Sequence, residues 1–132
     1  MLKGSCLCGA VAYEAGELLG PIGHCHCKTC RKAHSAAFAT TSRVSRESFR
    51  WLSGQAFLGS YESSPGKNRH FCTRCGTHLI AEWDGQDSVI LRLGSLDTDP
   101  QAMPQGHIWT DHAVPWLAYG PELPHFATTP QG

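Results

Sequence analysis

The sequence predicts a single small domain made mostly of β-strands, with one short helix. Three observations support this prediction. The chain has 132 residues, the size of one ordinary domain that can bury a modest core. Short runs of apolar, aromatic and β-branched residues are separated by turn residues, a pattern typical of strands. Only one short stretch has the character of a helix. We therefore treat residues 1–132 as one domain.

The N-terminal half is expected to place its cysteines between short strands. Pro21 and Gly23 predict a loop that delivers Cys25, and residues 29–36 predict the helix. Strands are expected over residues 9–14, 37–44, 48–52 and 57–62.

The C-terminal half contains the strongest hairpin signal of the chain. Residues 78–83 and 88–93 are apolar runs with the turn residues Asp84 and Gly85 between them. Before this hairpin, the composition of residues 63–66 predicts a turn. After Gly94 the chain is rich in proline, and we expect a loop-like segment that drapes over a sheet.

The charge balance disfavours two classes of protein. Eleven Lys and Arg residues balance eleven Asp and Glu residues, so the formal net charge is zero. This disfavours a nucleic-acid binder or a polybasic membrane protein. No apolar run approaches the ~20 residues of a membrane span, and the N-terminus lacks an apolar segment of signal-peptide length. We expect a soluble, cytoplasmic protein with no nucleic-acid or membrane partner.

Seven cysteines are the most informative feature. An odd number without an export signal argues against a disulfide scaffold. The cysteines instead form three local groups, a spacing typical of thiolate ligands for zinc or, less often, iron. The groups are Cys6 and Cys8; Cys25, Cys27 and Cys30; and Cys72 and Cys75.

The preferred division is a four-thiol site from the two doublets and a three-thiol site from the triplet. A closed tetrahedral site is structural, whereas three protein ligands leave a position for water or substrate. Alternatives stay open. The doublets could be redox-active or buried thiols. The seven cysteines could also be divided between metal sites in other ways. The triplet could be closed by any of the eight histidines, among which His24 adjoins the triplet and His78 follows Cys75 by three residues.

Glycine follows both doublets, at Gly9 and Gly76, but not the triplet. A turn around a metal-bound thiolate often needs a positive φ, which glycine adopts at no steric cost. The triplet is therefore expected to differ in kind from the two doublets.

Basic residues and histidines surround the cysteines. A charged side chain could bind a substrate carboxylate, although a solvated surface charge is the simpler interpretation of each one. These basic residues are Lys28, Arg31, Lys32, Arg69 and Arg74. His26 and His34 are candidate proton relays, because histidine titrates near neutrality; packing roles are the simpler alternative.

Five segments resemble the glutathione-dependent formaldehyde-activating (GFA) family, whose domain is shared by centromere protein V. They are residues 4–13, 25–32, 61–79, 106–109 and 114–116. The resemblance implies antiparallel sheets clipped by a structural zinc on Cys6, Cys8, Cys72 and Cys75, and a catalytic zinc on Cys25, Cys27 and Cys30.

The resemblance also implies an activity. Family members are grouped as carbon–sulfur lyases that join glutathione to formaldehyde as S-hydroxymethylglutathione, or reverse that reaction. The expected cofactor is therefore two Zn²⁺ per chain, and the expected partner is a small thiol such as glutathione. The alternative is a non-catalytic, zinc-stabilised binding module. Such a module needs only the doublets, so the intact triplet favours chemistry.

Overall fold

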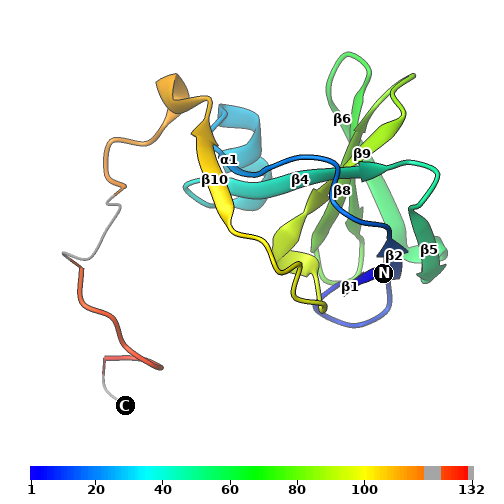
Figure 1. Ribbon diagram of the computed structural model, residues 1–132, viewed down its shortest axis with the longest axis horizontal. Helices are drawn as coiled ribbons and strands as arrows, with labels where there is room; N and C mark the ends of the chain where they lie inside the picture. Colours follow the sequence, from blue (N-terminus) through cyan, green and yellow to red (C-terminus); the bar gives the residue numbers. More distant parts are fainter. Residues whose placement is uncertain (118–122, 131–132) are drawn as a thin grey trace.

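Two β-sheets and one short helix make up the fold of the computed structural model, which describes residues 1–117 and 123–130 (Figure 1). The smaller sheet is antiparallel and has the strand order β1-β2-β5. Its strands are β1 (Leu2–Ser5), β2 (Ala12–Ala15) and β5 (Arg50–Ser53).

The larger sheet has seven strands in the order β10-β3-β4-β9-β8-β7-β6. Neighbouring strands are antiparallel, apart from the parallel pair β10 and β3 at one edge. The strands are β3 (Ile22–Cys25), β4 (Ala39–Ser45), β6 (Leu58–Ser64), β7 (Lys67–Cys72), β8 (His78–Trp83), β9 (Ser88–Arg92) and β10 (Pro104–Ile108).

The α-helix, α1 (Lys28–His34), connects β3 to β4. It ends at Ser35, which adopts the left-handed conformation with φ of 50°. Single turns of 3₁₀ helix are η1 (Gln55–Phe57), η2 (Leu93–Ser95) and η3 (Thr110–His112). In Figure 1, α1 lies close to β10 and far from the small sheet.

Side chains from both sheets form one hydrophobic core. Tyr13 of β2 is fully buried and stacks on Phe49, with ring centroids 5.3 Å apart. Its hydroxyl shares a hydrogen bond of 2.7 Å with Ser95 of η2. From the large sheet, Val44, Leu79 and Leu91 join the same cluster. The cluster also contains Cys6 and Cys72, so one cysteine of each doublet lies in the core.

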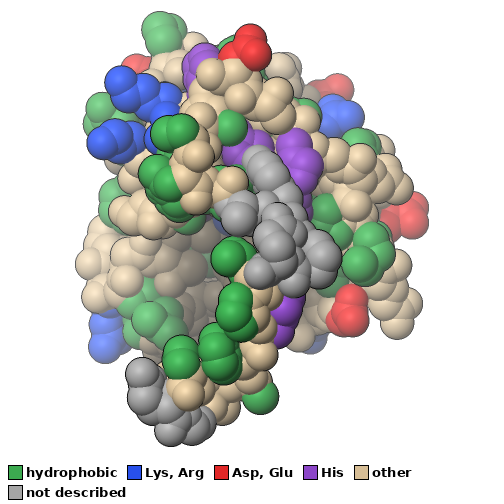
Figure 2. All heavy atoms as spheres, turned by 90° about the vertical axis from the view of Figure 1, so that its left-hand side faces the viewer, with side chains coloured by type: hydrophobic (Ala, Val, Ile, Leu, Met, Phe, Trp, Pro, Cys, Tyr) green, Lys and Arg blue, Asp and Glu red, His purple; other side chains and the backbone are tan. Residues whose placement is uncertain are grey.

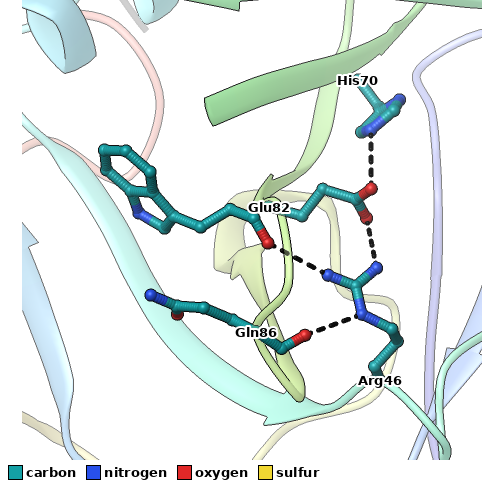
Figure 3. A network of polar contacts seen from close by, with 5 residues as sticks. Arg46, His70, Glu82 and Gln86 are labelled. Atoms are coloured by element: carbon teal, nitrogen blue, oxygen red, sulfur yellow. Dashed lines mark hydrogen bonds and ion pairs between the residues drawn. The ribbon is translucent and has the colours of Figure 1, made fainter. Parts of the chain in front are cut away.

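The predicted hairpin is confirmed as β8 and β9, which pair antiparallel. Arg46, which follows β4, binds to the turn of this hairpin and to the end of β8 before it (Figure 3). Its guanidinium donates to Glu82 Oε2 at 3.0 Å, to the Gln86 carbonyl at 2.9 Å and to the Trp83 carbonyl at 3.4 Å. His70 Nε2 lies 3.7 Å from the other Glu82 oxygen.

The fold confirms the mostly β prediction and contains four strands that the sequence did not predict. The loop predicted to deliver Cys25 is strand β3, the N-terminus contributes β1, and the segment before the second doublet is strand β7. The proline-rich segment, predicted to be loop-like, contributes β10, whose residues are all exposed and therefore show no apolar alternation. The part of that segment over residues 118–122 lies outside the described residues. None of the described helices is long and apolar enough to cross a membrane.

Candidate metal centres

The two cysteine doublets meet where the two sheets join. Cys6 and Cys8 lie in the loop between β1 and β2, while Cys72 ends β7 and Cys75 lies in the turn that follows. Their four Sγ atoms are all within 4.8 Å of one another. The Cys6 and Cys8 sulfurs are 3.6 Å apart, and the Cys8 and Cys72 sulfurs 3.9 Å apart. We call this group the doublet centre.

Turns around the doublet centre present N–H and O–H groups to sulfur. The Val11 N–H donates to Cys6 Sγ at 3.2 Å, and Thr77 Oγ1 lies 3.2 Å from Cys75 Sγ. Gly9 and Gly76 both have φ of +81°, which confirms the expectation that these turns need a positive φ. Nothing lies within 4 Å of a Cβ placed on either glycine, so the backbone conformation alone requires glycine.

The triplet is built by a strand end and a helix start. Cys25 is the last residue of β3, Cys27 is the N-cap of α1, and Cys30 lies in its first turn. The three Sγ atoms are within 4.8 Å of one another. The Cys30 N–H donates to Cys27 Sγ at 3.3 Å, so the helix cap itself fixes one thiol. Cys25 and Cys30 are buried, whereas Cys27 is half-buried. We call this group the triplet centre.

Both groups fit a thiolate-bound metal, with zinc favoured by the donor set. Zn–S bonds of ~2.3 Å in a tetrahedron place neighbouring sulfurs about 3.8 Å apart. The distances of 3.6 and 3.9 Å in the doublet centre agree with this spacing. Within the described part of the chain, neither group includes a histidine or a carboxylate.

The histidines near the triplet centre have other partners. His26 lies between two of the cysteines and is fully buried, and its Nε2 is 2.9 Å from Nδ1 of His107 on β10. His24 Nδ1 is 2.9 Å from Thr40 Oγ1. Figure 2 shows histidine side chains gathered on the side of the molecule where β10 lies. His24 and His78, which lie near cysteines in the sequence, are not in either sulfur group, and neither group includes any other described histidine.

Two buried arginines lie beside the triplet centre. Arg69 on β7 is 1% exposed and donates to Ser63 Oγ at 2.8 Å and to Thr29 Oγ1 at 3.1 Å. Its Nη2 is also 3.8 Å from Cys30 Sγ. Arg92, the last residue of β9, is 4% exposed. Among the described residues, neither arginine has a carboxylate within ion-pair distance.

These charges act on the Cys30 thiol. A hydrogen bond from Cys25 lowers the pKa of Cys30 to about 4; the Cys27 thiol, Arg92 and Arg69 act in the same direction, and burial opposes them. The sequence singled out Arg69 but missed Arg92, because Arg92 lies in the apolar hairpin strand, far along the chain from every cysteine. Arg74 is exposed and covers the Phe57 ring, 5.3 Å from its centroid, away from the triplet.

Cys27 opens onto a pocket of about 360 Å³, which we call the mouth. Lys67 reaches over the ring of Trp83 in its wall, with Nζ 5.3 Å from the ring centroid. Burial, followed by the charge of Arg69, lowers the pKa of Lys67. The residues lining the mouth are Cys27, Lys28, Thr29, Ser64, Lys67, Trp83, Trp109 and His112.

Of the basic residues that the sequence singled out, only Lys28 lines the mouth. Lys32 lines a different pocket together with Arg69. Sequence reasoning missed Lys67 and Trp83, although Lys67 lies in the segment that leads into the second doublet. The two candidate proton relays are also not at the mouth, since His26 is buried against His107 and His34 lines a separate cavity.

Comparisons with known proteins agree with the cysteine pattern. A family model described as glutathione-dependent formaldehyde-activating enzyme matches residues 1–112. A curated relative from Schizosaccharomyces pombe, named as an uncharacterized lyase, is 36% identical over 77 residues. That match covers 58% of this chain and 54% of the relative, so it spans about half of the yeast protein. A crystal structure of a Rhodobacter sphaeroides protein shares the fold, with a TM-score of 0.66, 23% identity, and coverage of 80% of this chain and 97% of the other.

Proposed function

The chain belongs to the glutathione-dependent formaldehyde-activating family, and on this premise we propose that it is a zinc-dependent carbon–sulfur lyase. Its reaction joins a small thiol such as glutathione to an aldehyde such as formaldehyde, or releases the aldehyde from the adduct. The lyase name of the yeast relative supports this reaction class.

One observation carries the proposal: three thiols converge without a fourth protein ligand among the described residues, and one of them lines an open pocket. Three protein ligands with an open position are typical of catalytic zinc, whereas four are typical of structural zinc. We therefore assign Cys25, Cys27 and Cys30 to a catalytic zinc, and Cys6, Cys8, Cys72 and Cys75 to a structural zinc. A purely structural module would need only the second set.

When bound at the triplet centre, Zn²⁺ supplies a position at which a thiol loses its proton and is held as thiolate. Cys25 and Cys30 are buried, so a substrate thiol reaches the centre from the Cys27 side, through the mouth. The substrate sulfur then adds to the carbonyl carbon of the aldehyde. A C–S bond forms, the π electron pair moves to oxygen, and a proton from solvent completes the hydroxymethyl thioether. The reverse reaction returns the same electrons and proton.

The side chains of the mouth suit a thiol that carries a carboxylate. The ammonium groups of Lys28 and Lys67 provide two positive charges beside Cys27, and Lys67 is held in place over Trp83. Charge-assisted hydrogen bonds from these groups would orient an anionic thiol with its sulfur toward the centre. Holding the thiol beside the aldehyde lowers the entropic cost of the reaction.

The test is a titration of the cobalt-substituted protein with glutathione. Binding of the substrate sulfur should change the visible thiolate spectrum, while S-methylglutathione, which lacks a free thiol, should not change it. Cys27→Ser should keep the fold and lose both the spectral change and catalysis of adduct exchange, followed by NMR of glutathione and formaldehyde. An unchanged spectrum at millimolar glutathione together with an absence of catalysis would contradict the proposal.

A further inference from the structure

A second cavity, of about 560 Å³, lies at the C-terminal end of α1, whereas the mouth lies at its start. It shares no lining residue with the mouth and contains no cysteine. We call it the histidine–arginine cavity, after the residues of its wall that matter here: His34 of α1, His78 of β8 and Arg92 of β9. Thr40, Thr77 and Ser95 add hydroxyl groups to the same wall.

Polar atoms of this wall lack partners. Four buried nitrogens have no hydrogen-bond partner: His34 Nε2, His78 Nδ1, and Nε and Nη2 of Arg92. A buried donor without a partner costs free energy, so native proteins rarely leave several together. The two imidazole rings are also close to each other, with centroids 4.9 Å apart. Half of the buried nitrogen atoms without a partner among the described residues therefore belong to three side chains of this one wall.

The charge of the wall is positive. Arg92 keeps its charge when buried, and at 4% exposure it gains little from water. Burial lowers the pKa of His34 to about 4, and Arg92 adds to this effect, so the ring is neutral at pH 7. No aspartate or glutamate is among the residues that line the cavity. An anionic ligand would compensate the positive charge of this wall. A planar carboxylate matches the forked geometry of a guanidinium group.

We propose that the histidine–arginine cavity binds the carboxylate group of a small organic acid. Arg92 supplies the positive charge, and the imidazole rings of His34 and His78 line the same wall. The thiols of the triplet centre raise the pKa of Arg92 against the effect of burial, so Arg92 is close enough to feel their charge while it lines the cavity. The proposal does not depend on the lyase activity.

The experiment uses the zinc-loaded wild-type chain and a ligand without sulfur. Glutarate is titrated into ¹⁵N-labelled protein, and the histidine side-chain and backbone resonances are followed by NMR. We expect the signals of His34 and His78 to shift with a millimolar dissociation constant, while glutaramide, the neutral analogue, leaves them unchanged. Arg92→Gln should lower the affinity for glutarate at least tenfold. The control is Arg43→Gln, at an exposed arginine on the neighbouring strand β4, which should leave this affinity unchanged.

Several results would overturn the proposal. These are an absence of shifts at His34 and His78, shifts confined to Lys28 and Lys67 at the mouth, or equal shifts with glutaramide. The assignment of a carboxylate ligand would also be wrong if inorganic phosphate binds more than tenfold more tightly than glutarate. If Arg92→Gln fails to fold, His34→Gln at a half-buried position provides the test, with a several-fold loss of glutarate affinity expected.

Discussion

Cys72→Ser should destabilise the protein, so that it unfolds at temperatures where the wild type is still folded. Cys72 is fully buried in the core shared by the two sheets. The serine side chain is shorter than that of cysteine, and its hydroxyl oxygen is a poorer ligand for a soft metal site than a thiolate. A metal at the doublet centre cross-links Cys8 to Cys72, which are 64 residues apart. With the loop-entropy relation for a covalent cross-link, such a closure stabilises the fold by about 4 kcal/mol.

That contribution is a large part of the total stability of a domain, which is about 5–15 kcal/mol. A loss of about 4 kcal/mol in a chain of this size lowers the melting temperature by on the order of 15 °C. The assay is thermal and urea unfolding of the metal-loaded protein, followed by tryptophan fluorescence, with the zinc content measured in parallel. Cys27→Ser is the matched control, because it makes the same change in the other centre. A Cys72→Ser protein that melts with the wild type would refute the structural role of the doublet centre.

Three other predictions concern the metal content, a buried hydrogen bond and a turn. Native mass spectrometry should find two zinc ions per chain, with only the ion of the triplet centre lost rapidly to a chelator; a single tightly held ion would contradict the assignment. Tyr13→Phe removes the buried hydrogen bond to Ser95 and should lower the free energy of unfolding by about 1 kcal/mol in urea. Gly76→Ala, at φ of +81° with open space around it, should cost about 1–2 kcal/mol in the same assay, and no effect would show that the turn does not need glycine.

The features that the sequence predicted well are local ones. The hairpin of β8 and β9 follows from two apolar runs and a turn between them, and the structure pairs them as expected. The positive φ at Gly9 and Gly76 follows from their place directly after a cysteine pair. The grouping of the sulfurs also agrees with the spacing, since each doublet brings half of a tetrahedron and the triplet lies within six residues.

The features that the sequence missed depend on contacts between distant segments. Strand β10 pairs parallel with β3 at the edge of the large sheet, and its exposed residues leave no periodic signal. Arg92 is a single charge at the end of an apolar strand, and only the packing of β9 beside β4 brings it near the triplet centre. Lys67 and Trp83 meet through the pairing of β7 with β8. None of these contacts is encoded in a local spacing.

We expect the two centres to differ in role, because their cysteines are distributed differently along the chain. The doublet centre connects the loop between β1 and β2 to the end of β7, so a metal there would cross-link the two sheets. The triplet centre takes all its ligands from one strand end and the first turn of one helix, so a metal there closes only a short loop and adds little to stability. A site that contributes little to stability can exchange a ligand without unfolding the protein. For this reason we expect substitutions at Cys27 to change thiol binding and substitutions at Cys72 to change folding.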